Sequence, residues 1–281
     1  MKNCQSILVC CLVVAVSAFV AGCPGNQPAA LVAAPAPLAA PIEPVVAYSA
    51  PAFPEAAPVY RPVAGKTVII DAGHGGDDHG ASHYGLREKD INLDLANRTA
   101  KALQAQGVAV LMTRRNDSFV SLPERSAFAN RSPNAVFVSI HVNASDGNPN
   151  ASGIETFLLT STQSDAERSV KALARYRASD PDPVRGKQAL ANLTAHCRTR
   201  GPVLAESVQK NLVARMGAVD RGIKTGNLAV LRETYFCPAI LVEVGFLTNH
   251  PTALSMRTDE WRRRTAEALA EGIVDYLRQP E

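Results

Sequence analysis

Val68-Ile-Ile-Asp-Ala-Gly-His-Gly-Gly76 is a β-branched apolar run that ends in a glycine-rich turn carrying one histidine. Val136-Phe-Val-Ser-Ile-His141 ends in a histidine in the same way, and Ala239-Ile-Leu-Val-Glu-Val-Gly-Phe246 carries a glutamate inside an apolar run. Short β-branched runs of this kind predict buried strands. Because segments with helical spacing lie between them, the sequence predicts an α/β fold with a largely parallel or mixed sheet.

The remaining elements follow from periodicity and from signals at helix ends. Ser121 is a suitable N-cap with Pro123 in the first turn behind it, and Gly107 suits a helix C-terminus. The proline-containing stretch 180–183 should end any preceding helix. We expect strands at 67–71, 108–113, 135–141, 153–159, 228–231 and 239–246, and helices at 88–106, 121–130, 164–177, 187–197, 202–216 and 260–277.

The first 64 of the 281 residues do not resemble the rest. Residues 1–22 have a basic start and an apolar stretch too short to cross a membrane comfortably, as in a secretory signal. Val20-Ala21-Gly22-Cys23 resembles a bacterial lipobox, in which Cys23 becomes lipidated; an ordinary signal peptide or an uncleaved anchor is the alternative. Residues 23–64 are rich in Ala and Pro and read as a tether. Residues 65–281 are expected to form the single catalytic domain.

Charge and cysteine content limit the possible partners. The net charge of +3 is too small to indicate nucleic-acid binding. Four of the six cysteines lie in the first 23 residues, which leaves Cys197 and Cys237 in the domain. These two could pair in an oxidising compartment or remain as two buried thiols.

Four side chains are candidates for chemistry, and each also has a simpler explanation. His74 and His141 follow buried strands, where ligand groups of open α/β sheets collect, although either could be a hydrogen-bonded structural histidine. Glu88 begins a helix, where an acidic residue also complements the helix dipole. Glu243 lies in an apolar strand, where a buried carboxylate needs a metal or an arginine partner.

Taken together, the four residues match a mononuclear zinc hydrolase. His74, Glu88 and His141 form a His2Glu set, which holds catalytic zinc and leaves one position for water. Glu243 would be the separate general base that moves a proton from water to the leaving nitrogen. Asn143 is placed to line the same cleft. The other histidines are weaker candidates: His79 and His83 as contacts near the site or as solvated loop residues, and His196 and His250 without any site context.

The domain resembles the zinc-dependent N-acetylmuramoyl-L-alanine amidases of the type-3 amidase family over most of residues 66–277. The resemblance rests on an ordered set of motifs rather than on any one of them. These are Asp71-Ala-Gly-His-Gly-Gly76, Glu88-Lys-Asp90, Thr113-Arg114, Leu122-Pro-Glu-Arg125, Ser139-Ile-His-Val-Asn143, Gly153-Ile-Glu155 and Val242-Glu-Val-Gly-Phe-Leu-Thr-Asn249.

The resemblance implies one domain with a mixed, roughly six-stranded sheet flanked by helices. It implies Zn²⁺ held by His74, Glu88 and His141, and Glu243 as the catalytic glutamate. The implied substrate is peptidoglycan, cut between the lactyl group of N-acetylmuramic acid and L-alanine during cell separation or wall remodelling. We expect a monomer in the periplasm, held through lipidated Cys23 at a membrane, which Pro24 after the cysteine suggests is the outer one.

One stretch departs from the short members of the family. Residues 160–200 are long, and in some members an insertion here covers the zinc until an activator protein binds. The sequence therefore suggests a covering segment near 160–200 and an activator as partner. Two other functions stay open: a zinc carboxypeptidase acting on stem peptides, although compact His-x-x-Glu or His-x-x-x-His spacings are absent, and a non-catalytic module that binds the wall.

Overall fold

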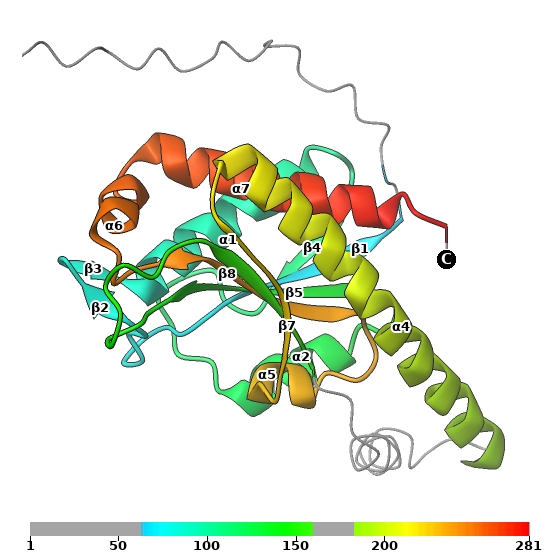
Figure 1. Cartoon of the computed structure of the whole chain (residues 1–281). Helices are drawn as coiled ribbons and strands as arrows, with labels where there is room; N and C mark the ends of the chain where they lie inside the picture. The colour runs from blue at the N-terminus through cyan, green and yellow to red at the C-terminus, as the bar shows by residue number, and fades with distance from the viewer. Residues whose placement is uncertain (1–62, 64, 160–182, 281) are drawn as a thin grey trace, which may run out of the picture. The chain divides into compact units, whose positions relative to one another are not determined.

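The computed structural model describes residue 63 and residues 65–159 and 183–280 (Figure 1). The predicted signal segment, nearly all of the predicted tether and the predicted helix at 164–177 lie outside the described residues. Among the described residues, no helix is both long and apolar enough to cross a bilayer.

The described residues form a six-stranded mixed sheet, as the sequence predicts. The strand order is β4-β1-β5-β8-β6-β7, and all neighbours are parallel except β6 and β8. The strands are β1 (Thr67–Ala72), β4 (Ala109–Met112), β5 (Val136–Asn143), β6 (Ile154–Leu159), β7 (Asp220–Gly226) and β8 (Ala239–Phe246). A small hairpin, β2 (Ser82–His83) and β3 (Leu86–Arg87), stands apart from the sheet.

Helices cover the two faces of the sheet unequally. The helices are α1 (Glu88–Gln104), α2 (Leu122–Asn130), α4 (Pro183–Met216), α5 (Ala229–Arg232), α6 (His250–Met256) and α7 (Asp259–Leu277). Helices α1, α4 and α7 lie on one face, and α2 and α5 lie on the other (Figure 1). The first face buries the larger apolar core, which includes Ile70, Val138 and Val242.

The second face buries apolar side chains only along part of each strand. Phe137 and Leu241 pack in a smaller core against α5. Side chains on one face alternate with a period of two, so Phe137, Ser139 and His141 share this face, as do Leu241 and Glu243. Toward the carboxyl ends of β5 and β8 the second face therefore changes from apolar to polar.

Local sequence signals set several of the element ends. Ser121 is the N-cap of α2, as predicted: its hydroxyl accepts from the Glu124 amide, and the Glu124 side chain accepts from the Ser121 amide. This reciprocal pair satisfies two amides that the first helical turn leaves without partners. Gly107 has a φ of 81°, a left-handed conformation that glycine adopts without strain, in the turn between α1 and β4.

Two element predictions were wrong. The expected helices at 187–197 and 202–216 are one continuous helix, α4, with Pro202 inside it. Proline removes one helical hydrogen bond, but the buried residues Leu204, Ala205 and Val208 pack the following turns into the larger core. The expected strand at 228–231 belongs to the short helix α5, because the amides of Leu231 and Arg232 both donate to the Leu228 carbonyl.

Candidate active site

Three side chains from separate elements converge beside the carboxyl ends of β1 and β5. His74 lies in the loop after β1, Glu88 is the first residue of α1, and His141 lies on β5. Nε2 of His74 is 3.2 Å from Oε1 of Glu88, and Nδ1 of His141 is 2.9 Å from the same oxygen. One potential ligand atom from each residue lies within 4.8 Å of the others. The three sequence candidates therefore form one cluster.

Glu88 is buried at the centre of this cluster rather than exposed at a helix end. Its side chain is 7% exposed, and its Oε2 accepts a hydrogen bond from the Ala81 amide at 2.9 Å. Burial alone would raise its pKa, but hydrogen bonds and charge interactions with His141 and His74 hold the pKa of Glu88 well below its usual range. Complementing a helix dipole does not require this burial, so the helix dipole alone does not account for the position of Glu88.

His74 has a second carboxylate partner that the sequence reasoning missed. Nδ1 of His74 lies 2.8 Å from Oδ2 of Asp78, which leaves Nε2 directed to Glu88. Burial works against protonation, but hydrogen bonds with Glu88 and Asp78 outweigh it and raise the pKa of His74. A carboxylate on the outer ring nitrogen is the usual way in which proteins orient a histidine that ligates metal.

Two buried arginines hold the loop that carries His74. His74 has a φ of 61°, which is unusual for a residue with a side chain. Nη2 of Arg125 donates to the His74 carbonyl at 2.7 Å, and Nη2 of Arg114 donates to the Gly73 carbonyl at 2.9 Å. Nη1 of Arg125 also pairs with Oδ1 of Asp71 at 2.6 Å. The Thr113-Arg114 and Leu122–Arg125 motifs thus fix the backbone of a strained turn.

Two glycines leave room for the clustered side chains. A Cβ atom on Gly73 would come within 2.3 Å of the His141 ring. A Cβ atom on Gly80 would lie 2.5 Å from Oε2 of Glu88 and 2.7 Å from the His74 ring. No side chain fits at either position without moving the cluster. The glycines therefore let the loop backbone approach the clustered side chains closely, in addition to allowing sharp turns.

Glu243 lies next to the cluster on the neighbouring strand. It is in register with His141 on β5 and with Glu155 on β6. Among the described residues, its Oε2 is enclosed and has no hydrogen-bond partner, so the alternative of a structural arginine pair is not met there. Burial, followed by the negative charges of Glu88 and Glu155, raises the pKa of Glu243 well above its usual value.

The residues present fit a zinc ion. Two imidazoles and one ionised carboxylate are the ligand types of a catalytic zinc site, and Asp78 supports one of the imidazoles. The unpartnered, enclosed Oε2 of Glu243 beside this set also fits, because a buried carboxylate is stabilised by a nearby cation.

The other sequence candidates lie outside the cluster. His79, His196 and His250 are exposed, and His83 lies 3.4 Å from Asp146. Asn143, by contrast, lies beside the site, because its side-chain amide donates to Oε1 of Glu155 at 2.7 Å.

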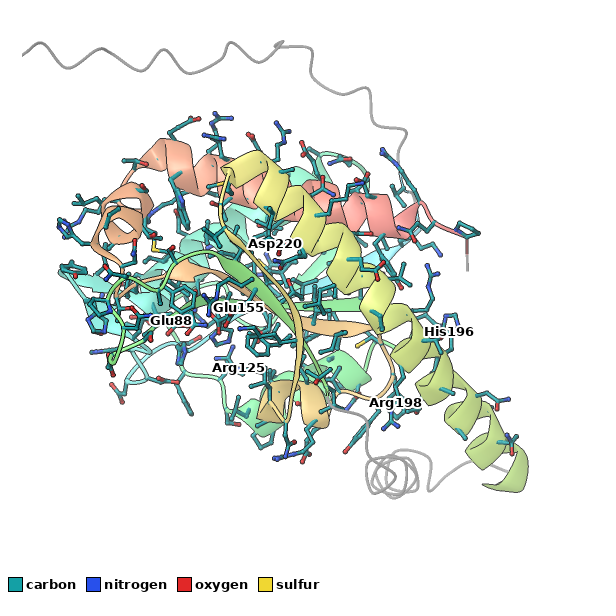
Figure 2. All side chains as sticks on the ribbon, in the orientation of Figure 1. Glu88, Arg125, Glu155, His196, Arg198 and Asp220 are labelled. Carbon is teal, nitrogen blue, oxygen red and sulfur yellow. The ribbon has the colours of Figure 1, made fainter. Side chains whose placement is uncertain are left out.

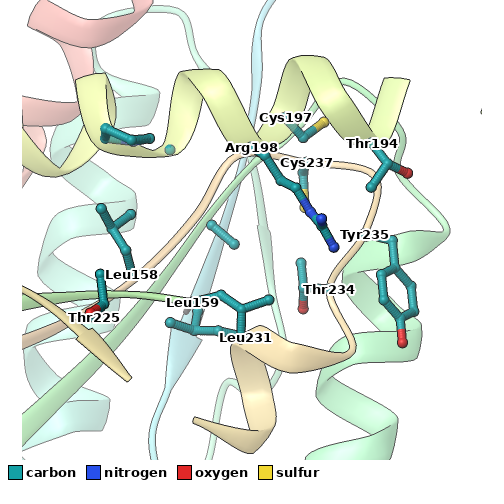
Figure 3. Close-up of a pocket in the computed structure, with 13 residues that line it drawn as sticks. Leu158, Leu159, Thr194, Cys197, Arg198, Thr225, Leu231, Thr234, Tyr235 and Cys237 are labelled. Carbon is teal, nitrogen blue, oxygen red and sulfur yellow. The ribbon is translucent and has the colours of Figure 1, made fainter. Parts of the chain in front are cut away.

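Two of the cavities beside the sheet bear on the predicted site residues and cysteines. One of about 320 Å³ adjoins the cluster, with His74 and His141 on one wall and the exposed side chains of Phe119 and Leu122 on another. The other, of about 270 Å³, lies between α4 and α5 and contains none of the four predicted site residues (Figure 3). Cys197 and Cys237 line it as free, buried thiols, so they are not paired in this structure.

Comparison with known proteins agrees with the geometry. A family model described as N-acetylmuramoyl-L-alanine amidase matches residues 68–275. N-acetylmuramoyl-L-alanine amidase LytC of Bacillus subtilis is 34% identical over 219 residues, which cover 78% of this chain and 37% of LytC. AmiC of Neisseria meningitidis, an N-acetylmuramoyl-L-alanine amidase, is 32% identical, covering 77% of this chain and 53% of AmiC. The chain thus spans only part of the length of these relatives.

Solved structures have the same fold. An N-acetylmuramoyl-L-alanine amidase from Clostridium difficile 630 aligns with a TM-score of 0.59 and 32% identity, over 75% of this chain and 96% of that one. The CwlD amidase from Clostridioides difficile, in complex with the GerS lipoprotein, aligns with a TM-score of 0.58 and 25% identity, over 75% of this chain and 98% of that one.

Proposed function

Because this chain belongs to the N-acetylmuramoyl-L-alanine amidase family, we propose that it hydrolyses the amide between the lactyl group of N-acetylmuramic acid and L-alanine in peptidoglycan. The observation that carries the proposal is the convergence of His74, Glu88 and His141 beside Glu243, whose Oε2 is enclosed and has no hydrogen-bond partner among the described residues. A module that only binds the wall has no need of such a carboxylate.

We propose that His74, Glu88 and His141 hold zinc through Nε2 of His74, a carboxylate oxygen and a ring nitrogen of His141. When bound, zinc supplies a Lewis acid that polarises the scissile carbonyl and lowers the pKa of water toward about 7. Glu88 keeps its negative charge because both histidines lower its pKa. Asp78 fixes the ring of His74, and Arg125 fixes the backbone that carries it.

Glu243 is the proton carrier in this proposal. Its Oε2 is free to accept a proton from the attacking water and to release it to the departing nitrogen, as a general base and then a general acid. Burial and the neighbouring carboxylates raise the pKa of Glu243, which suits a group that must take up and release a proton in one turnover. A cation on the adjacent cluster would offset part of this rise.

The predicted N-terminal segments suggest where the enzyme acts. We propose a location in the periplasm with lipidated Cys23 in the outer membrane and residues 23–64 as a tether to the wall. Action in cell separation or wall remodelling, and control by an activator that moves a covering segment near 160–200, belong to the same proposal. The CwlD amidase bound to GerS is a related amidase that has a protein partner.

Digestion of purified muropeptides, followed by mass spectrometry and metal analysis, tests the proposed function. We expect free N-acetylmuramic acid ends, intact stem peptides, and about one zinc per active chain. Release of single amino acids from the stem peptide would instead support the zinc carboxypeptidase. Binding without any cleavage by the zinc-loaded protein would support the wall-binding module.

A further inference from the structure

A pair of cations, Arg221 and Lys224, lies on β7, a strand that the sequence did not predict. Both contact Glu155, which Figure 2 labels and whose side chain is 4% exposed. Nε of Arg221 and Nζ of Lys224 lie 2.6 and 2.5 Å from Oε2 of Glu155. The other oxygen of Glu155 accepts from Asn143.

This pair carries more positive charge than Glu155 needs. One cation with good hydrogen bonds would neutralise a buried carboxylate, yet two are present, which leaves a net charge of +1. The side chains of Arg221 and Lys224 are 33% and 38% exposed, so both reach solvent. An ammonium has three donors, and among the described residues only Glu155 pairs with that of Lys224.

Aromatic rings hold the two cations in place. The Arg221 guanidinium lies 4.8 Å from the centre of the Phe246 ring, and the Lys224 ammonium lies 5.8 Å from that of Phe157. Cation–π contacts of this length are attractive and limit the motion of long side chains. Arg221 and Lys224 are therefore held in place and partly exposed, and they have hydrogen-bond donors that Glu155 does not use.

The strand order shows on which side of Glu243 the two cations lie. His141 on β5, Glu243 on β8 and Glu155 on β6 are in register, and β7 follows β6. The cations therefore lie beyond Glu243, on the side away from the metal-ligand cluster. In the proposed hydrolysis Glu243 protonates the departing nitrogen, so the peptide leaves toward β6 and β7.

We infer that Arg221 and Lys224 form a subsite for a carboxylate of the departing peptide, an inference that rests on the proposed function. Two strand spacings of about 4.8 Å separate β8 from β7. An extended peptide advances about 3.4 Å per residue, and the long side chains of the pair reduce the span further. The carboxylate recognised is therefore one borne by the first or second residue after the scissile bond.

Two matched substrates test this inference. Both are synthetic N-acetylmuramoyl dipeptides, one with a free α-carboxylate on the second residue and one with the corresponding carboxamide. We expect the zinc-loaded wild type to favour the carboxylate form by about tenfold in kcat/KM, as for a hydrogen bond to a charged group. Lys224→Met should lose that preference by slowing cleavage of the carboxylate form alone, and Lys224→Arg should keep it.

Lys210→Met is the matched control, because Lys210 is exposed on α4, which packs on the opposite face of the sheet. It should retain the preference of the wild type. Equal slowing of both substrates by Lys224→Met would overturn the inference, since it would mean that Lys224 acts only through Glu155 and Glu243. Equal rates of wild type on both substrates would also overturn it. If wild type and the variant lacking residues 166–187 cleave neither these substrates nor purified muropeptides, the proposed function itself is rejected, and the inference with it.

Discussion

Replacing Arg125 with methionine should destabilise the domain far more than a surface change of the same kind. Its side chain is 3% exposed and that of its ion-pair partner Asp71 is 1% exposed, with 2.6 Å between Nη1 and Oδ1. The same guanidinium donates to the carbonyls of Ala72, His74 and Val120. The substitution therefore leaves a buried carboxylate without its counter-ion and three carbonyls without these donors.

The expected loss is about 3–5 kcal/mol in the free energy of unfolding, as for other buried pairs broken on one side. For a domain of this size it corresponds to a fall of about 6–20 °C in Tm. Urea unfolding followed by circular dichroism measures the loss, with chelator present so that bound metal does not contribute. Zinc retention should fall as well, because the carbonyl of His74 is no longer held.

Two further variants decide whether the charge is the cause. Asp71→Asn combined with Arg125→Met should recover most of the lost stability, because an amide needs no counter-ion. Thr113 and Ser139 contact different oxygens of Asp71, so the amide oxygen can accept from one hydroxyl while the NH2 group donates to the other. Arg263→Met removes exposed pairs with Glu260 and Glu267 and should change stability by less than about 1 kcal/mol. A single variant as stable as this control, or a double variant no better than the single one, would refute the reasoning.

Four other changes test the site and its proposed cover. Glu243→Gln should retain zinc but lower turnover by about two to four orders of magnitude, because the amide cannot carry the proton; strong remaining activity would reject the assigned role. His74→Ala should lose zinc, measured by metal analysis, and a fully loaded variant would contradict its role as ligand. Gly73→Ala should displace the ring of His141 and weaken zinc binding, whereas Gly147→Ala, with nothing within 4 Å of the added atom, should not. Deleting residues 166–187 should raise basal activity if that segment covers the site, and an unchanged or lower rate in a folded variant would count against a cover.

The predictions of β5 and β8 from sequence were confirmed. The strands that carry His141 and Glu243 have apolar runs long enough to identify, and their polar residues interrupt that pattern. Parallel strands bring such positions to one edge of the sheet. The burial of Glu88 could not be predicted without tertiary information, because a buried and an exposed glutamate at a helix start look alike in sequence.

The wrong and missed element predictions have different physical causes. Strand β7 reads Asp-Arg-Gly-Ile-Lys-Thr-Gly and has no apolar run, because it is an edge strand with mostly exposed side chains. Pro202 does not end α4, since buried side chains hold the turns after it. The apolar residues 228–231 are too few to distinguish a strand from a helical turn.

The unequal cover of the sheet explains why the proposed active site lies on the second face. Three long helices bury the first face, so an ionised cluster there would lose its hydration without gaining room for a substrate. On the second face α2 and α5 cover only the apolar part of the strands, and the polar ends of β5 and β8 stay accessible. Accessibility alone would leave the cluster loose, and rigidity comes from two buried arginines, Arg114 and the α2 residue Arg125, which hold the loop that carries His74. Losing either arginine should therefore weaken metal binding before it unfolds the larger core on the opposite face.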